Sequence, residues 1–249
     1  MSLLALLGAT ASLQRGEQVY DTPGSYTWTV PAGVYSVSVV AIGGGGGGAA
    51  VNDSDGLRRL PEIGAAGGGG GALGYRNDIA VTPGQTCTIG VGAGGSEVTG
   101  NDESLYQAGT GGATTFDDGT ATLVAVQGGA GGSVNFGYGA TAGVGGVVTT
   151  GSGGAGADGT DARGIDVTSS TVNGGGGDTG RYTGNATTVT ETGQSLFGNG
   201  GGGTLYGAGG DATSVANVSA TANAGQDGAL RIVWPGTLRQ FPSTDVAAT

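Results

Sequence analysis

The sequence contains no histidine and only one cysteine. Without an imidazole, neither a Ser-His-Asp triad nor a Cys-His pair can form, so the hydrolases that depend on them are excluded. A single cysteine also excludes a disulfide within the chain. Cys87 alternates with Ile89 and Val91 on one face of a predicted strand, which favours a small buried side chain over a reactive thiol.

Positive charge is scarce as well. The chain has 8 Lys and Arg residues against 19 Asp and Glu residues, for a net charge of −11 at pH 7. Phosphate backbones and anionic membrane surfaces repel such a chain, so we predict no nucleic-acid partner. No stretch approaches the ~18 apolar residues of a transmembrane helix, so we also predict no membrane insertion.

Proline is rare, at 6 residues, whereas glycine accounts for 61 of the 249 residues. Collagen is excluded because no Gly-X-Y triplet is sustained. Disorder is typical of high charge and few β-branched residues. Here only 11% of residues are charged, and Val, Ile and Thr recur in short alternating runs. The composition therefore predicts an all-β fold with almost no helix.

Residues 36–48 show how the chain is organised. The first seven, Ser-Val-Ser-Val-Val-Ala-Ile, are typical of a half-buried strand, and six consecutive glycines follow. A run such as 43–48 offers only backbone, so other segments can approach closely but no side-chain core can form. We predict that hydrogen bonds between extended, polyproline-II-like glycine segments hold this middle together, within one chain or between chains.

Ordinary strands are predicted to frame the glycine-rich middle, as in a β-sandwich-like domain over residues 17–235. A short Pro/Gly link joins the strand around Trp28 to the strand at 34–42, which predicts an antiparallel pair. The alternating run 229–234 is expected beside them, closing the domain. A hairpin is predicted at 114–126 and a weak strand at 215–222.

Two arms are predicted to flank this domain. Residues 1–16 form an apolar arm that we expect to dock on a partner or a sister subunit; a tail that folds back onto its own domain is the alternative. The docking side chains of this arm are Leu3, Leu4, Leu6 and Leu7. Residues 236–249 are expected to form an extended arm, with Phe241 as a second docking side chain.

Aromatic residues near glycines are the candidates for receptor binding. Aromatic faces stack on sugar rings, and glycines let a ligand reach the backbone. The candidates are Tyr75, Tyr106, Phe136, Tyr138, Tyr182, Phe197 and Tyr206. The alternative for each is that its ring is buried and fills space in a core that has few large side chains.

Acidic residues suggest calcium sites. Asp53, Asp55 and Glu62 fall at positions three, five and twelve of a calcium loop, but Val51 stands at position one and glycine runs replace both flanking helices. Partial repeats of a calcium-binding β-roll end at Asp158, Asp178 and Asp211. A polar loop is the simpler interpretation, so we predict no bound metal and no cofactor.

Cleavage of a glycan requires only two carboxylates. The candidate pairs are Asp53 and Asp55, Asp102 and Glu103, and Asp117 and Asp118. Each pair lies in a turn-like context where acids are common for conformational reasons. We therefore predict that the protein is not an enzyme, with a depolymerase as a minor alternative.

Several motifs occur in an order that is familiar. They are Thr22-Pro-Gly-Ser-Tyr-Thr-Trp-Thr-Val-Pro-Ala-Gly33, a valine-rich strand, a long glycine run, Val81-Thr-Pro-Gly-Gln-Thr86, Val91-Gly-Ala-Gly-Gly95, Gly111-Gly-Ala-Thr-Thr-Phe116, Leu230-Arg-Ile-Val-Trp234 and Arg239-Gln-Phe-Pro-Ser-Thr244. Over residues 20–244 this resembles the glycine-rich domain of tailed-phage tail-fibre and other virion structural proteins, of the marine phage type.

The resemblance implies a non-enzymatic, β-rich protein of the virion surface, in tail or capsid, often an oligomer; a trimer is the number it suggests. In some such adhesins, glycine-rich strands stack as polyproline-II bundles and exposed loops contact the host receptor. We expect an adhesin that contacts other virion proteins and binds a host surface glycan or protein. The alternative is a capsid decoration protein whose two arms clamp neighbouring shell subunits.

Overall fold

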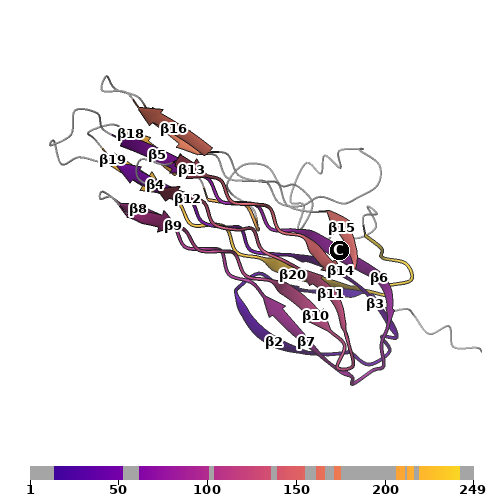
Figure 1. The fold of residues 1–249 in the computed structure, drawn as a ribbon. Helices are drawn as coiled ribbons and strands as arrows, with labels where there is room; N and C mark the ends of the chain where they lie inside the picture. Colours follow the sequence, from indigo (N-terminus) through magenta and orange to yellow (C-terminus); the bar gives the residue numbers. More distant parts are fainter. Residues whose placement is uncertain are drawn as a thin grey trace, which may run out of the picture.

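The computed structural model describes residues 14–52, 62–100, 104–135, 139–154, 161–165, 171–174, 206–210, 212–215 and 219–241. Over these residues the chain forms 20 strands in five sheets and no helix, which confirms the predicted all-β fold (Figure 1). The molecule is elongated. Two sheets lie at one end, the proximal end, and three at the other, the distal end, with glycine-rich backbone between them.

The proximal end is a β-sandwich of two five-stranded antiparallel sheets. Sheet 1 consists, in spatial order, of β1 (Gly16–Tyr20), β20 (Ala229–Trp234), β3 (Ser36–Ile42), β6 (Leu73–Ala80) and β15 (Ser152–Gly154). Sheet 2 consists of β14 (Val148–Thr150), β11 (Thr122–Val126), β10 (Thr114–Asp117), β7 (Thr86–Val91) and β2 (Gly24–Thr29). Alternate side chains of both sheets point inward and form the main hydrophobic core.

The main core joins the two sheets through large side chains. Phe116 and Ile89 of sheet 2 are fully buried in one cluster with Ile232 of sheet 1. The rings of Trp28 in β2 and Trp234 in β20 meet across the sandwich with centroids 5.7 Å apart. The predicted hairpin at 114–126 is confirmed as β10–β11, and β20 pairs with β3 as expected.

Two expectations about these strands need correction. β2 does not pair with β3: β2 pairs with β7 in sheet 2, while β3 lies between β20 and β6 in sheet 1. The link at 31–33 crosses between the sheets because Trp28 and Val39 both point into the space between them. β3 is also buried on both faces, since Val40 and Ile42 pack in a second cluster on the outer side of sheet 1.

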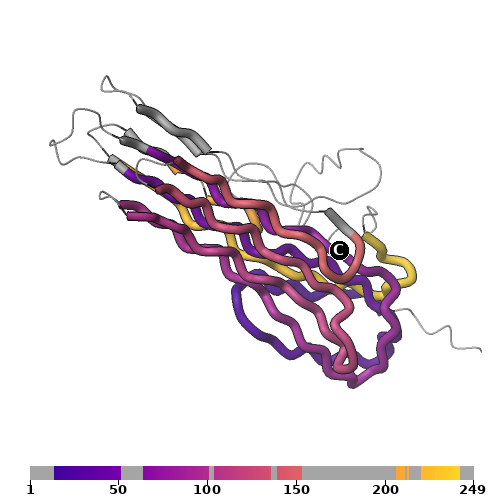
Figure 2. The backbone as a smooth tube through the Cα atoms, viewed as in Figure 1, coloured from indigo at the N-terminus to yellow at the C-terminus, as the bar shows by residue number. Residues whose placement is uncertain are grey.

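Eight linking segments run between the two ends of the molecule (Figure 2). They are g1 (43–48), g2 (67–72), g3 (92–97), g4 (108–113), g5 (127–132), g6 (142–147), g7 (207–210) and g8 (223–228). A six-residue segment in polyproline-II conformation spans about 19 Å. The linking segments therefore act as a spacer between the sandwich and the distal sheets.

The hydrogen bonds of g1 repeat every three residues. Gly43 and Gly46 donate their N–H groups to g2, at 2.9 and 2.8 Å. Gly44 and Gly47 donate in the same way to g4. Gly45 and Gly48 donate to g8. Polyproline II has three residues per turn and no internal hydrogen bonds, so its amides point in three directions to three neighbours. The predicted polyproline-II-like pairing is therefore present within a single chain.

Segment g1 is the centre of a bundle. It donates hydrogen bonds to g2, g4 and g8, and its carbonyls accept hydrogen bonds from g3, g5 and g7. Hydrogen bonds also join these six neighbours to one another in the closed order g2–g7–g8–g3–g4–g5–g2, and g6 bonds to g2 and g5 from outside. The segments are therefore packed hexagonally in three layers. The middle layer contains g3, g1 and g2; g4, g5 and g6 lie on one side of it, and g8 and g7 lie on the other.

Glycine is required in g1 because neighbouring backbone occupies the place of a side chain. A Cβ added at Gly45 would lie closer than 3.0 Å to the carbonyl oxygen of Ala208 in g7, and one added at Gly46 would meet that of Ala130 in g5. Each glycine over 43–47 meets a backbone carbonyl in this way. A segment with six such neighbours has no room for any other residue.

Other residues occur in the outer segments where they point away from the bundle. In g6, Val144 and Val147 are exposed, whereas Gly143 and Gly146 are buried and bonded to g2. Ala93 and Ser96 in g3, and Thr110 and Ala113 in g4, are exposed at the same three-residue interval. In these segments, the exposed interruptions of the glycine runs mark the outer surface of the bundle.

The three layers continue at the distal end as three sheets. Sheet 3 contains β13 (Gly139–Thr141), β12 (Ser133–Asn135) and β9 (Leu105–Gln107); sheet 4 contains β16 (Asp161–Ile165), β5 (Glu62–Ala66), β4 (Ala49–Asn52) and β8 (Val98–Gly100); sheet 5 contains β17 (Thr171–Gly174), β18 (Ala212–Val215) and β19 (Ser219–Ala222). Small buried side chains of sheet 4 pack on both sides: Ala49 toward Val134 of sheet 3, and Ala50 toward Ala212 of sheet 5. The single weak strand predicted at 215–222 needs correction: Val215 ends β18, and residues 219–222 form a second strand, β19, antiparallel to it.

A single methyl group in g1 tests the bundle. We expect Gly45→Ala to lower the free energy of unfolding by about 3 kcal/mol or more, because the backbone of g7 must move away. Ala93→Ser, at an exposed position of g3, should change it by less than about 0.5 kcal/mol. Urea unfolding followed by circular dichroism measures both. Equal stability of the two variants would contradict the close packing.

Candidate functional site

Both described ends of the chain lie at the proximal end. The side chain of Gln14 lies beside Gly33, in the turn between β2 and β3 that faces away from the bundle. The last described residue, Phe241, bonds to Asn77 in β6, near the end of that strand remote from g2. Among the described residues, the distal end is therefore formed by segments that run between it and the sandwich.

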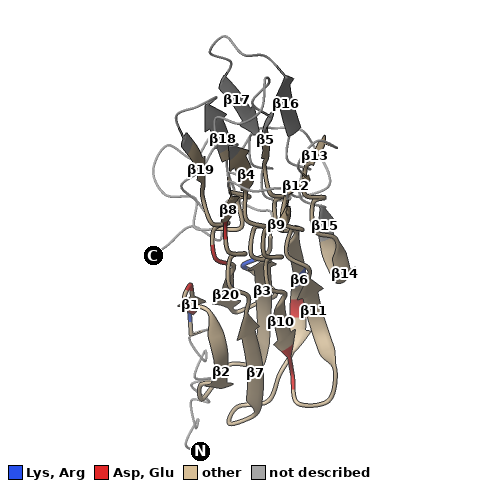
Figure 3. Ribbon diagram, turned by 60° about the vertical axis from the view of Figure 1, so that its left-hand side comes forward, with Lys and Arg blue, Asp and Glu red and all other residues tan. Residues whose placement is uncertain are grey.

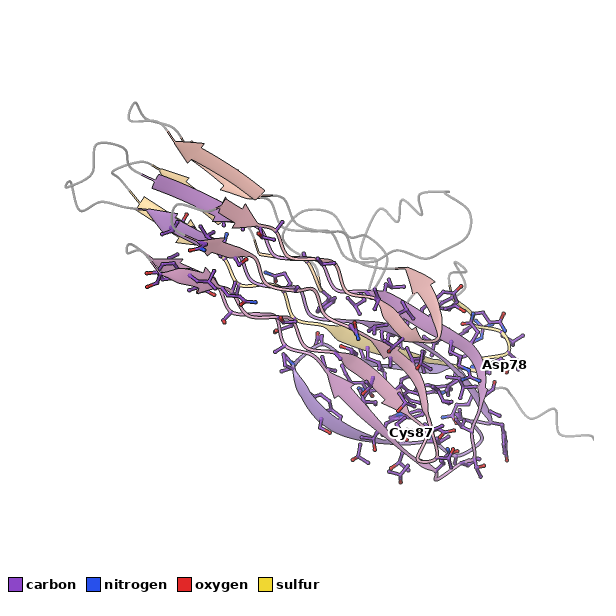
Figure 4. All side chains as sticks on the ribbon, viewed as in Figure 1. Asp78 and Cys87 are labelled. Carbon is purple, nitrogen blue, oxygen red and sulfur yellow. The ribbon has the colours of Figure 1, made fainter. Side chains whose placement is uncertain are left out.

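The chain after β20 folds back onto sheet 1. Gly236 donates its N–H to Ser36 O at 3.0 Å. The Asn77 amide binds the Phe241 backbone twice: Nδ2 donates to Phe241 O at 2.6 Å, and Oδ1 accepts from Phe241 N at 2.8 Å. Asp78, labelled in Figure 4, has a φ of 50° at a register shift between β3 and β6. This bulge places Asn77 against the returning chain.

Phe241 is only 4% exposed and packs with Val40 and Val233 in the cluster on the outer side of sheet 1. An extended arm that begins at residue 236, with Phe241 presented to a partner, is therefore not what the structure contains up to residue 241. The physical reason is that sheet 1 has apolar side chains on both faces, and the returning chain covers the outer one. Leu3, Leu4, Leu6 and Leu7 lie outside the described residues, so their docking role stays a prediction.

Glu17 of β1 joins the first strand to the last one. Its Oε2 accepts hydrogen bonds from Arg231 Nη2 at 2.6 Å and from Arg239 Nη2 at 3.1 Å, and the two arginine side chains are 5% and 2% exposed. Arg239 Nη1 also donates to Gly16 O at 2.6 Å. Partial burial raises the pKa of Glu17, but the hydrogen bonds and charges of the two arginines lower it overall below its ordinary value.

The three aromatic candidates that the structure describes lie at two places. Tyr75 and Tyr206 are half-buried against the cluster on the outer side of sheet 1, and the Tyr206 hydroxyl donates to Asp21 Oδ2 at 3.1 Å. Burial, with this bond and the charge of Asp21, raises the pKa of Tyr206. Tyr106 lies at the distal end with its ring against Gly100. The other four candidates, Phe136, Tyr138, Tyr182 and Phe197, lie outside the described residues.

Five connections between strands meet at the distal end. The strand registers place there the ends that are joined by residues 53–61, 101–104, 136–138, 166–170 and 216–218. Most of these connecting residues lie outside the described ones. Asn135 and Gly139, which flank residues 136–138 in the sequence, are paired across β12 and β13 at this end. We call this end the tip.

The acidic pair Asp117 and Asp118 is engaged by its own turn. Asp118 Oδ1 accepts hydrogen bonds from Thr120 Oγ1 at 2.6 Å and from Ala121 N at 2.9 Å, which lower its pKa. Asp117 Oδ1 accepts from Gly119 N at 2.7 Å. These bonds stabilise the β10–β11 turn, as acids commonly do in such positions. Asp117 and Asp118 therefore have a conformational role that accounts for their presence.

The side chains of Asp53, Asp55, Glu62, Asp102, Glu103, Asp158, Asp178 and Asp211 lie outside the described residues. Among the side chains that are described, no group of three or more acids or cysteines is placed to hold a metal ion.

A family model described as a glycine-rich domain matches residues 21–235. The chain belongs to the glycine-rich domain family. The match begins just after β1 and ends one residue after β20, so it takes in the sandwich, the bundle and the distal sheets together. No curated protein matches the chain. In the described parts of this glycine-rich domain, no helix is long and apolar enough to cross a membrane.

One surface of the glycine-rich domain was missed from the sequence. Residues 104–116, 126–135 and 139–150, which include g4, g5, g6 and sheet 3, contain no charged residue, and their ribbon is tan in Figure 3. Of the strands that continue this layer into sheet 2, β10 ends in a charged residue, Asp117. Leu105, Val144 and Val147 are exposed on it. The three-residue spacing of the non-glycine residues in the glycine runs could have predicted this surface. That spacing places side chains on one side of a segment only if the segment is polyproline II.

The ion pairs of Glu17 make stability depend on pH. Because the folded-state pKa of Glu17 is lowered, its interactions stabilise the fold above the ordinary value of 4.5 and are lost as pH falls through the folded-state pKa. We expect Glu17→Gln to lower the free energy of unfolding at pH 7 by about 2 kcal/mol, since two buried arginines lose their counter-charge.

Urea unfolding at a series of pH values checks this. The difference between wild type and Glu17→Gln should shrink steadily below pH 4.5. Glu97→Gln, at an exposed residue of g3, is the matched control and should leave stability unchanged. A pH-independent difference would show that the charge of Glu17 is not what stabilises the fold.

Cys87, labelled in Figure 4, is fully buried in the main core of the glycine-rich domain. Burial, with smaller contributions from Asp118 and Asp117, raises the pKa of its thiol to about 11. At pH 8 only about one thiol in a thousand is then ionised. We expect no reaction with a thiol-specific dye in native protein and one equivalent after unfolding in urea. Rapid labelling of the folded protein would contradict this position of Cys87.

Proposed function

We propose that this glycine-rich domain is a structural protein of a phage virion, a tail-fibre or tail-associated adhesin. It binds a host cell-surface receptor, glycan or protein, non-covalently through the tip, while the proximal end faces other virion proteins. The virion assignment comes from the resemblance of the motifs described above. The division of roles between the two ends is supported by the polarity of the fold.

The observation that carries the proposal is the separation of the chain ends from the loops. Gln14 and Phe241 lie at the sandwich, and the five connections at the tip lie beyond the bundle. Binding residues are concentrated on loops that a rigid scaffold positions. A protein anchored through its proximal end would present all five connections outward at once.

The bundle suits a role as a stiff spacer. Each of its segments hydrogen-bonds to at least two others, and g1 is surrounded on all sides. Bending such a bundle would break backbone hydrogen bonds that water cannot replace in the centre. The tip is thereby held at a constant distance from the sandwich.

The chemistry of the described residues supports binding rather than hydrolysis. Asp117 and Asp118 are occupied by turn hydrogen bonds, Cys87 is buried, and the chain has no histidine. Phe241 is held in its own domain, which weighs against a capsid clamp made by this part of the C-terminal segment. Weak single sites would become effective through many copies on one particle.

Cell binding by labelled protein tests the proposal, with competition against phage adsorption on the same bacteria. We expect the double variant Phe136→Ser/Tyr138→Ser, in the β12–β13 connection, to reduce binding at least about tenfold, as loss of stacking aromatics does at other hot spots. Tyr35→Ser removes an exposed aromatic at the proximal end and should leave binding unchanged. Normal adsorption by particles that lack the protein would overturn the adhesin assignment.

A further inference from the structure

We propose that the outer side of the g4–g5–g6 layer, continued by sheet 3 at the tip, is a contact surface between two copies of this chain. We call it the lateral face. The inference goes beyond the proposed function, because it concerns the side of the molecule and not the tip. Four observations carry it: absence of charge, exposed apolar side chains, regular relief, and backbone donors without partners.

Charge is missing from the lateral face although the chain as a whole carries −11. None of residues 104–116, 126–135 and 139–150 is charged. Two copies of so acidic a chain repel each other over most of their surface. The repulsion is weakest where the facing surfaces of both copies carry no charge. Depletion of charge is also the compositional mark of the buried centre of protein interfaces.

Large hydrophobic side chains are exposed on the same face. Leu105 is 62% exposed, Val144 63% and Val147 46%; they are three of the five large hydrophobic side chains that are exposed among the described residues. Leu105 points outward because its neighbour Tyr106 packs inward against sheet 4. Both valines project from g6 at the three-residue interval. Val144 and Val147 lie one polyproline-II turn apart on g6, whereas Leu105 lies in β9 at the edge of sheet 3. Neighbouring exposed apolar groups such as the two valines mark interaction surfaces.

The relief of the lateral face is self-complementary. Outward side chains recur about every 9 Å along each segment, one per polyproline-II turn, with bare glycine backbone between them. In g5, Gly128 and Gly131 form the floor: their N–H groups have no hydrogen-bond partner among the described residues, whereas those of Gly129 and Ala130 do. The exposed Thr110 and Gln127 side chains of a second copy carry oxygen atoms that can accept from these donors. A twofold axis lets each copy do so to the other.

A neutral polysaccharide is the other partner that an uncharged face suggests. Sugar rings are bound by stacking on exposed aromatic faces, and the one tyrosine among the described residues of this layer, Tyr106, packs inward instead. A second copy therefore fits the lateral face better than a glycan does. A twofold axis along the length of the molecule would place two tips side by side. The two tips would then bind the receptor together, and this consequence alone rests on the proposed function.

The test is the molar mass of the full chain in solution, measured by sedimentation equilibrium over a concentration series. We expect wild type to reach twice the chain mass and the association to tighten as salt rises, because salt screens the residual repulsion. Val144→Glu/Val147→Glu should stay at the mass of one chain. Tyr35→Glu/Leu238→Glu replaces two large exposed hydrophobic side chains at the proximal end and should dimerise like wild type.

Three results would overturn the inference. Wild type that stays monomeric at every concentration excludes the contact. Dimers that persist in Val144→Glu/Val147→Glu, or that are lost in Tyr35→Glu/Leu238→Glu, place the contact elsewhere. Soluble dextran and mannan, tested on monomeric wild type, would assign the face to a glycan if binding occurs and Val144→Glu/Val147→Glu abolishes it.

These results are separable from those on the proposed function. The tip variant Phe136→Ser/Tyr138→Ser should dimerise normally while losing cell binding, whereas Val144→Glu/Val147→Glu should keep single-site binding. Its apparent affinity for cells should fall at least about tenfold through loss of bivalency.

Discussion

The hydrogen bond between an amide of one glycine segment and a carbonyl of the next is the interaction on which this structure depends. It is short-range and directional, and it is made only when two backbones approach without side chains between them. In g1 that condition applies on six sides, and the segment is six glycines long. The amino-acid composition of the protein is thus a steric consequence of how its middle is held together.

The bundle also decides how the two ends relate. Sheets 1 and 2 are a two-layer sandwich, whereas the tip has three layers, and the linking segments convert one arrangement into the other. Segment g3, for example, leaves β7 in sheet 2 and enters β8 beside β4 in sheet 4. A β-ladder bonds to neighbours on two sides only, but polyproline II bonds in three directions. The layers can therefore be exchanged without leaving buried amides unpaired.

Particular residues show where sequence patterns were sufficient. The alternation of Cys87, Ile89 and Val91 gave the inward face of β7, and Asp117–Gly119 gave the β10–β11 turn, because both signals are local. The predicted pairing of the Trp28 strand with the strand at 34–42 was wrong because the link between them, residues 30–35, crosses between the two sheets instead. Phe241 was misplaced because nothing near it in the sequence reveals that the outer face of sheet 1 is apolar and needs a cover.

By itself, the sequence determined that the protein is all-β, has no imidazole chemistry, and is held together in its middle by backbone pairing, since these follow from composition and short-range periodicity. Only the tertiary structure decided which segment lies at the centre, which side of the bundle lacks charge, and that Gln14 and Phe241 lie at the end opposite to the three distal sheets. Those features depend on which distant segments become neighbours. Glycine runs with nearly identical sequences carry no information about their partners until the strands at both ends have set the register.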